Sequence, residues 1–196
     1  MKARLLALFA VLGVPLMVGA AAPNPPAVVK ARCSVCHGDA GETAGEDFPR
    51  LSGQHETYLA KQLRDFQAGT RTGLMVRQAR GLSEAEITAI ARYYAAQPVP
   101  APTAAPSDKL AAGRSIYLNG KPASSVPPCM ACHGEAAHGT PQLPRLATQH
   151  ADYLERQLKD FTLRKRTNDN AVMHEVAENL TPAEMRAVAE YLASLR

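Results

Sequence analysis

The sequence contains no tryptophan, and tyrosine and phenylalanine together make up only 5% of its 196 residues. Its lysines and arginines are scattered among the acidic residues and form no basic stripe. A surface for single-stranded nucleic acid needs aromatic side chains for stacking and a continuous basic groove. We therefore expect no nucleic-acid partner, although the formal net charge is +4.

The sequence also lacks an apolar run that would span a membrane comfortably, which takes about twenty residues. Its longest run extends from Leu5 to Val18. Lys2 and Arg4 precede this run and small residues follow it, a pattern typical of a secretory signal peptide. We expect residues 1–22 to be a signal peptide and the protein to be periplasmic, and we leave association with the membrane surface open.

Cysteine is scarce, and all four cysteines belong to two copies of the motif C-x-x-C-H. Two thiols one helical turn apart can each add to a vinyl group of haem while the adjoining imidazole reaches the iron. The two copies therefore predict two covalently bound haem c groups. The predicted thioether residues are Cys33, Cys36, Cys129 and Cys132, and the predicted axial ligands of the iron include His37 and His133.

Paired cysteines have other uses in proteins. Four thiolates suit a structural zinc ion, but zinc does not account for a histidine directly after both pairs. A thioredoxin-like redox pair needs a βαβ setting, of which the sequence shows no sign. Disulfide bonds are a further alternative, because an exported chain with an even number of cysteines can form them. The zinc and disulfide interpretations stay open at this point.

The sequence repeats itself after about ninety-five residues, the length of one small domain. Between the copies, residues 98–107 are rich in proline and alanine and predict a stiff, extended linker. We expect a first domain at 23–97 and a second at 108–196. The matched segments are Pro49-Arg50-Leu51 with Pro144-Arg145-Leu146, Gln54-His55 with Gln149-His150, Tyr58-Leu59 with Tyr153-Leu154, Gln62-Leu63 with Gln157-Leu158, and Asp65-Phe66 with Asp160-Phe161.

Each copy is predicted to be helical. Ser83 with Glu86 makes a capping box ahead of apolar residues at helical spacing, and Thr181 with Glu184 repeats this signal in the second copy. The matched leucines and phenylalanines lie on one face of a middle helix in each copy, and a further helix should lead into each haem motif. Because no segment alternates apolar and polar residues for long, we expect an all-α fold.

Two methionines are candidates for the remaining axial positions. Met75 and Met173 each lie seven residues before the leucine that precedes the closing helix, Leu82 or Leu180. A methionine that only fills a gap in the core is the alternative, and His174 is a competing ligand beside Met173. The loop before the first methionine is about three residues shorter than its counterpart. We therefore expect two different reduction potentials.

The other histidines and methionines have simpler interpretations. His55 and His150 occupy matched positions before the middle helices, and we expect partly exposed side chains at a helix start or near a haem propionate. His138 has no counterpart and is predicted to lie in a loop. Met185 is predicted to be a core residue of the closing helix, and Met130 a spacer within its haem motif.

The duplicated haem motif, the repeated Gln-x-x-x-Tyr-Leu-x-x-Gln-Leu segment and the late methionine before a capped helix together resemble the dihaem cytochrome c4 family. The resemblance covers nearly all of the chain after the predicted signal peptide. It implies two tandem class I cytochrome c-like domains packed with their haems near one another. It also implies that the carbonyl groups of Pro49 and Pro144 orient the axial histidines.

The copies differ in their opening segments. Gly113-x-x-x-Tyr117 in the second copy is similar to the family's contact between the opening and closing helices. In the first copy, Pro25 and Pro26 leave room only for a short opening helix.

By this resemblance the protein is a one-electron carrier and not an enzyme. It would serve redox protein partners such as a quinol-oxidising complex and a terminal oxidase. Iron held by histidine and methionine is coordinatively full, so no small-molecule substrate is expected. A second hypothesis is the electron-accepting subunit of a larger dehydrogenase, such as a flavocytochrome sulfide dehydrogenase. A third is a dihaem enzyme with peroxidase or thiosulfate-oxidising activity, which needs an open iron position or a cysteine ligand, and no spare cysteine remains.

Overall fold

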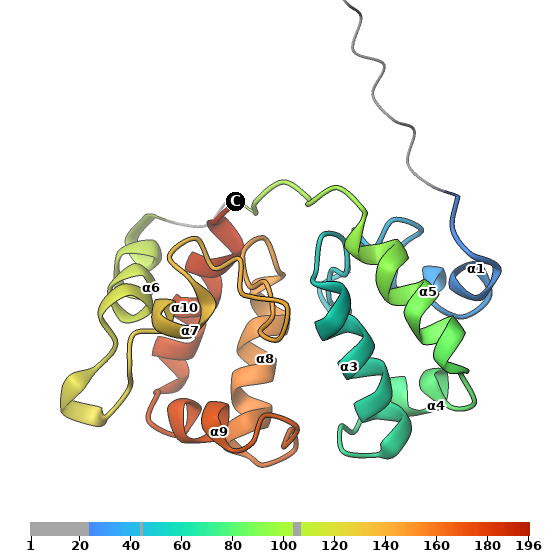
Figure 1. The fold of residues 1–196 in the computed structure, drawn as a ribbon. Helices are drawn as coiled ribbons and strands as arrows, with labels where there is room; N and C mark the ends of the chain where they lie inside the picture. Colours follow the sequence, from blue (N-terminus) through green and yellow to red (C-terminus); the bar gives the residue numbers. More distant parts are fainter. Residues whose placement is uncertain (1–23, 44, 104–106) are drawn as a thin grey trace, which may run out of the picture.

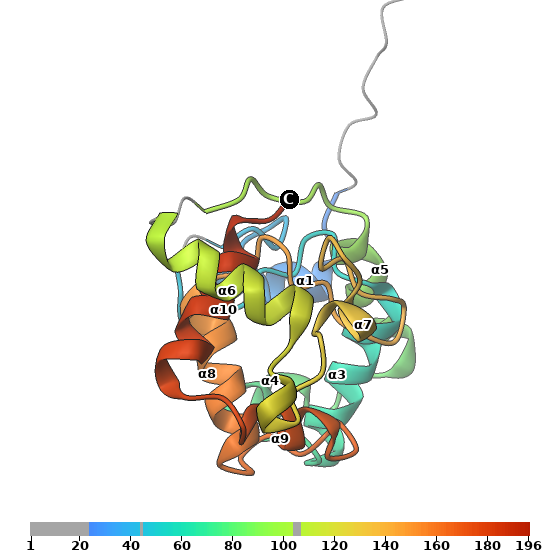
Figure 2. The same ribbon diagram turned by 90° about the vertical axis from the view of Figure 1, so that its left-hand side faces the viewer.

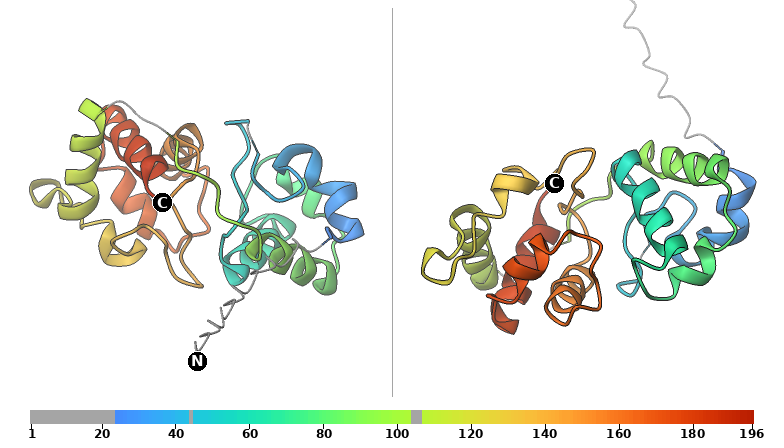
Figure 3. Two further views of the ribbon diagram at one scale, coloured as in Figure 1. Left: turned by 90° about the horizontal axis from the view of Figure 1, so that it is seen from above. Right: turned by 60° about the horizontal axis from the view of Figure 1, so that its bottom comes forward.

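The structure is a computed structural model that describes residues 24–43, 45–103 and 107–196, with the side chains of 107–109 left out. The predicted signal peptide, 1–22, lies outside the described residues, as does part of the predicted linker. The described residues form helices and no strand, which confirms the all-α prediction. Figures 1 and 3 show two helical halves side by side, joined by an extended connection.

The two halves repeat one order of helices: opening segment, haem motif, middle helix, short helix and closing helix. The first half contains α1 (Ala27–Arg32), α2 (Ser34–His37), α3 (Glu56–Ala68), α4 (Met75–Ala79) and α5 (Glu84–Ala95). The second contains α6 (Ser107–Asn119), the short 3₁₀ helix η1 (Pro122–Ser124), α7 (Met130–His133), α8 (Ala151–Thr162), α9 (Val172–Ala177) and α10 (Pro182–Ser194). The short helices α4 and α9 were not predicted from the sequence.

Both closing helices begin as the sequence predicts. The Ser83 side chain accepts a hydrogen bond from the backbone of Glu86, whose carboxylate accepts from the backbone of Ser83 in return. Thr181 and Glu184 form the same reciprocal pair at the start of α10, with a proline at its first position. Each box satisfies two backbone N–H groups that a helix start leaves without partners.

Each half has its own hydrophobic core. The first is built mainly from α3 and α5, with Leu63, Ile87 and Tyr94 among its buried residues. The second is built from α6, α8 and α10, and it includes Met185, as predicted. The two separate cores agree with two tandem domains, while the exact boundaries at 97/98 and 107/108 stay a prediction.

The opening helices differ as expected. In the second half α6 lies across α10 (Figure 2), and a Cβ atom at Gly113 would lie 2.1 Å from the carbonyl oxygen of Ala187. Only glycine allows so close an approach of the two helices. In the first half the opening helix α1 has only six residues. Among the helices that the structure describes, none has the length and apolar character needed to cross a membrane.

Candidate haem sites

The first C-x-x-C-H motif places a buried histidine at the end of α2. His37 is 4% exposed, and its Nδ1 lies 3.0 Å from the carbonyl oxygen of Pro49. A carbonyl oxygen only accepts hydrogen bonds, so Nδ1 carries the proton and Nε2 keeps its lone pair for a metal. Burial lowers the pKa of His37 against the opposing effect of the Pro49 hydrogen bond. The ring is therefore neutral, as a ligand of iron must be.

The second motif repeats this arrangement with a longer contact. His133, at the end of α7, is 7% exposed, and burial lowers its pKa as well. Its Nδ1 lies 3.4 Å from the carbonyl oxygen of Pro144. The expected proline contacts are thus present in both halves. The second is the weaker hydrogen bond, because it lies beyond the usual N–H···O range.

The glycine after each of these histidines is held by a tyrosine, but from different helices. In the first half, the hydroxyl of Tyr94 in the closing helix donates to the carbonyl oxygen of Gly38 at 3.3 Å. In the second half, the hydroxyl of Tyr117 in the opening helix donates to the carbonyl oxygen of Gly134. The closing helix of the first half thereby supplies the hydrogen bond that its short opening helix does not.

The cysteines suit neither of the alternative interpretations. All four are free thiols. Burial raises the pKa of Cys33 and of Cys129 to about 11. Within the described residues, no three of the side chains of histidine, cysteine, aspartate and glutamate come close enough to hold a metal ion together. These observations weigh against the zinc and disulfide interpretations.

The two candidate methionines lie in the first turn of short helices that follow the middle helix in each half. Met75 is the first residue of α4 and packs half-buried against the first core. Met173 is the second residue of α9, and its N–H donates to the carboxylate of Asp169 at 2.7 Å. Before it, Asn170 and Ala171 have left-handed φ angles of 56° and 67°. The two methionines are therefore held by differently built loops, as their sequences predict.

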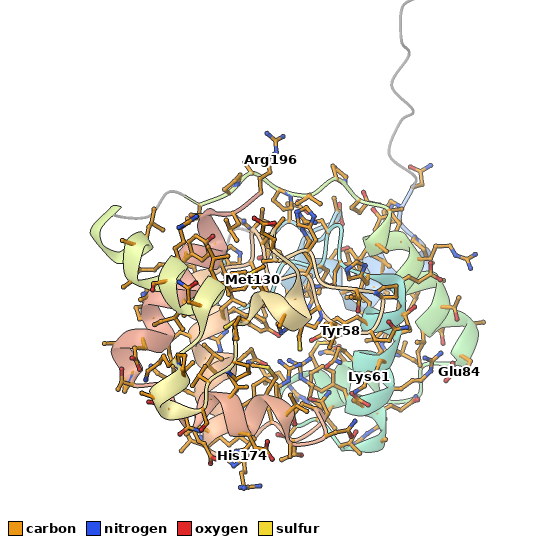
Figure 4. All side chains as sticks on the ribbon, turned by 60° about the vertical axis from the view of Figure 1, so that its left-hand side comes forward. Tyr58, Lys61, Glu84, Met130, His174 and Arg196 are labelled. Carbon is orange, nitrogen blue, oxygen red and sulfur yellow. The ribbon has the colours of Figure 1, made fainter. Side chains whose placement is uncertain are left out.

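His174, the competitor of Met173, has protein partners at both ring nitrogens. Its Nδ1 lies 2.8 Å from the carbonyl oxygen of Phe161, and its Nε2 lies 3.1 Å from the carboxylate of Glu178. Figure 4 shows His174 at the end of the molecule opposite Arg196 and away from Met130 of the haem motif. Because neither nitrogen is available, Met173 is the better candidate of the two.

The histidines at the middle helices contact the opposite half, which the sequence did not reveal. His55 and His150 immediately precede α3 and α8, as predicted. However, the His55 Nε2 lies 2.7 Å from the carbonyl oxygen of His138, and the His150 Nε2 lies 3.0 Å from that of Thr43. The expectation of partial exposure was wrong for His150, which is buried because the first half covers it. His138 lies in a loop, as expected.

The boundary between the halves is built from the repeated polar residues. Figure 1 shows α3 and α8 on the two sides of this boundary. The Arg71 guanidinium donates to the hydroxyl of Tyr153 at 3.0 Å and to the side-chain oxygen of Gln157 at 2.8 Å. In the mirror arrangement, the Arg166 guanidinium donates to the hydroxyl of Tyr58 at 2.9 Å. The repeat of Tyr58 and Gln62 as Tyr153 and Gln157 indicated duplication, but the sequence analysis did not predict that these polar residues form an interface.

The residues present fit covalently attached haem. Each half presents two thiols separated by two residues, a buried neutral imidazole with Nε2 available, and a methionine on a short helix that follows the middle helix. Thioether attachment uses the neutral thiols, and a histidine with a thioether sulfur completes the coordination of a low-spin haem iron.

Comparisons with known proteins agree with this arrangement. The family model described as cytochrome c matches residues 110–196, and the model described as subunit III of cbb3-type cytochrome c oxidase matches residues 20–93. The chain is 39% identical to cytochrome c4 of Thiocapsa roseopersicina, over 83% of this chain and 86% of that protein. It is 39% identical to a thiosulfate dehydrogenase electron acceptor of Thiomonas intermedia, over 84% of this chain and 78% of that protein.

A solved structure shares the fold over most of the chain. The crystal structure of reduced cytochrome c4 from Pseudomonas stutzeri matches with a TM-score of 0.81 at 33% identity, over 86% of this chain and 95% of that one. Two cytochrome c domains in one chain, each with its own attachment motif, define a dihaem c-type cytochrome. The chain belongs to the cytochrome c4 family. It carries two covalently bound haem c groups and is an electron-transfer protein.

Proposed function

We propose a specific residue set for each haem. In the first half, Cys33 and Cys36 form the thioethers and His37 and Met75 are the axial ligands. The second half uses the corresponding residues Cys129, Cys132, His133 and Met173. The single observation that carries this assignment is the pair of buried, neutral imidazoles, each with Nδ1 bonded to a proline carbonyl and Nε2 left available.

The proposed ligands make each site suited to one-electron transfer. A haem iron with histidine and methionine ligands changes between the ferric and ferrous states without binding a substrate, and the thioether favours the ferrous state. The chain's own residues exclude water from the axial histidines and orient their rings. Burial excludes water from His37 and His133, and the proline carbonyls fix the plane of each ring.

The ligand assignment is tested by replacing Met173 with alanine. We expect this variant to lose part of the weak long-wavelength sulfur-to-iron band of the oxidised protein and to bind carbon monoxide when reduced. Met185→Ala is the matched control, because Met185 is a core methionine on α10 and should leave the band unchanged. A full band in Met173→Ala, or carbon monoxide binding in the unaltered protein, would contradict the assignment.

We further propose that the protein is exported to the periplasm and relays electrons between a donor such as a quinol-oxidising complex and a terminal oxidase. Large apolar side chains are exposed beside the proposed ligands: Val35 is 90% exposed, Leu74 71% and Val172 56%. Exposed apolar side chains beside a haem site can take part in the short-lived docking of redox partners. The domain assignment that goes with this proposal is 23–97 and 108–196, joined by the linker 98–107.

A second candidate function is electron acceptance from a dehydrogenase. It is favoured by the similarity to the Thiomonas protein named a thiosulfate dehydrogenase electron acceptor. The two functions are separated by mixing the oxidised protein with either a quinol-oxidising complex and quinol, or a thiosulfate dehydrogenase and thiosulfate. The faster haem reduction, followed by absorbance, identifies the donor, and stable copurification with a dehydrogenase would favour the second function.

A further inference from the structure

Each proposed axial histidine, His37 or His133, is linked through one peptide group to a glutamine of the opposite half. The carbonyl of Pro49, which contacts His37, belongs to the same peptide group as the N–H of Arg50. That N–H donates to the side-chain oxygen of Gln149 at 2.9 Å. The chain of groups therefore runs from His37 in the first half, through the Pro49–Arg50 peptide, to Gln149 in the second half.

The reverse link has the same construction. The carbonyl of Pro144 contacts His133, and the N–H of the same peptide group, on Arg145, donates to the side-chain oxygen of Gln54 at 2.8 Å. Gln54 in turn donates to the carbonyl oxygen of Arg145 at 3.0 Å. The two links are related by the internal repeat, as in the isologous interface of a symmetric dimer.

Both glutamines are fixed by further bonds. Gln149 is 6% exposed, its amide nitrogen donates to the carbonyl oxygen of Arg50 at 2.9 Å, and its oxygen also accepts from the N–H of His150 at 3.1 Å. Gln54 is equally buried and accepts from the N–H of His55 at 3.0 Å. Because the donor and acceptor sides of both amides are used, neither can turn without losing a hydrogen bond.

We propose that Gln149 and Gln54 are positioning residues that tune the haem of the opposite half. Accepting a hydrogen bond from the peptide N–H polarises the peptide and makes its carbonyl oxygen a stronger acceptor. The stronger carbonyl draws the imidazole proton and makes the histidine a better electron donor to iron, which stabilises the ferric state. Docking of the halves thereby lowers the reduction potential of both haems, each through the glutamine of its partner half.

The test is a redox titration of the haem-loaded full-length protein with Gln149→Leu and, separately, Gln54→Leu. Gln149→Leu should raise the potential of the first haem, and Gln54→Leu that of the second. NMR signals that are assigned through contacts within each half identify which haem has changed. The imidazole Nδ1–H signal should shift in the half whose haem potential changes, which is the half opposite the substituted glutamine. If Gln149→Leu does not fold, Gln149→Asn, which is one methylene shorter, should give the same shift to a smaller extent.

Tyr58→Phe is the matched control, because it removes a cross-half hydrogen bond without contacting either proline–arginine peptide. Tyr58→Phe should not shift the reduction potential of one haem relative to that of the other. The proposal is overturned if Gln149→Leu leaves the first haem unchanged, if it shifts the haem of its own half equally, or if the control gives the same shift. The proposal rests on the histidine ligation proposed above, which the spectrum of the unaltered protein tests separately.

Discussion

Replacing Arg71 and Arg166 by methionine, singly and together, tests whether the boundary between the halves acts as one hydrogen-bonded unit. Arg71 is 8% exposed and donates to Gln62, Tyr153 and Gln157. Arg166 donates to the same Gln157 oxygen at 2.9 Å. Each guanidinium also lies over a phenylalanine ring of its own half, at 4.6 Å from the ring centroid, a contact that a methionine side chain partly retains.

The shared glutamine oxygen sets the expected magnitudes. When Arg71 alone is removed, Gln157 still accepts from Arg166 and Gln62 still accepts from Asn168, so the main loss is the charged hydrogen bond to Tyr153. Such a bond contributes about 1.5–3 kcal/mol to the free energy of unfolding. Removing both arginines also leaves the oxygen of the half-buried Gln157 without either donor, and this costs more, up to the roughly 1–3 kcal/mol of a fully buried acceptor. The double variant should therefore be less stable than the sum of the single effects predicts.

The assay is urea unfolding of the haem-loaded protein, followed by circular dichroism, for the four proteins of a double-mutant cycle. A control cycle pairs Arg71→Met with Lys121→Met, because Lys121 bonds Asn179 and Glu184 and shares no partner with Arg71. The control cycle should be additive. If the Arg71 and Arg166 effects also add within about 0.5 kcal/mol, the reasoning from the shared oxygen is refuted.

Three further predictions concern the haems and the second core. Cys33→Ala with Cys36→Ala should leave a protein with one haem and a poorly folded first half; an unchanged thermal transition would contradict this. A redox titration should resolve two potentials, the lower at the first haem, because its proline carbonyl lies closer to the imidazole; a single potential would count against it. Hydrogen bonds from Lys121 and from the N–H of Thr181 hold the pKa of Glu184 below its usual range. Its stabilising effect is therefore complete above the unfolded pKa of about 4.3 and is lost as the pH falls through the lower folded value. In Glu184→Gln, urea midpoints should fall less steeply with acid, and an unaltered slope would exclude this contribution.

The local signals in the sequence were sufficient for the haem motifs and the main helices. A capping box such as Ser83 with Glu86 acts within one turn, so the sequence alone fixes where α5 begins. The attachment motif is equally local. The role of Gly113 could be predicted only in part. Its spacing to Tyr117 indicates a helix contact, but the 2.1 Å distance from a Cβ atom at Gly113 to the carbonyl oxygen of Ala187 depends on where α10 lies.

The relations between the halves could not be predicted in the same way. Gln54 and Gln149 were recognised as matched residues, but a polar residue at a helix start is as compatible with solvent as with a partner half. Their contacts depend on how the two separate hydrophobic cores are packed together. The same reason explains His150, whose exposure was misjudged because the surface that covers it lies about a hundred residues away in the chain.

The central claim is that the chain carries one covalently attached haem on each C-x-x-C-H motif. It is tested most directly by the intact mass of the exported protein, prepared from a host that matures c-type cytochromes, together with its optical spectrum. We predict the mass of the polypeptide without residues 1–22 or a similar leader, plus two haems, and a low-spin c-type spectrum. A mass equal to that of the bare polypeptide would contradict the claim.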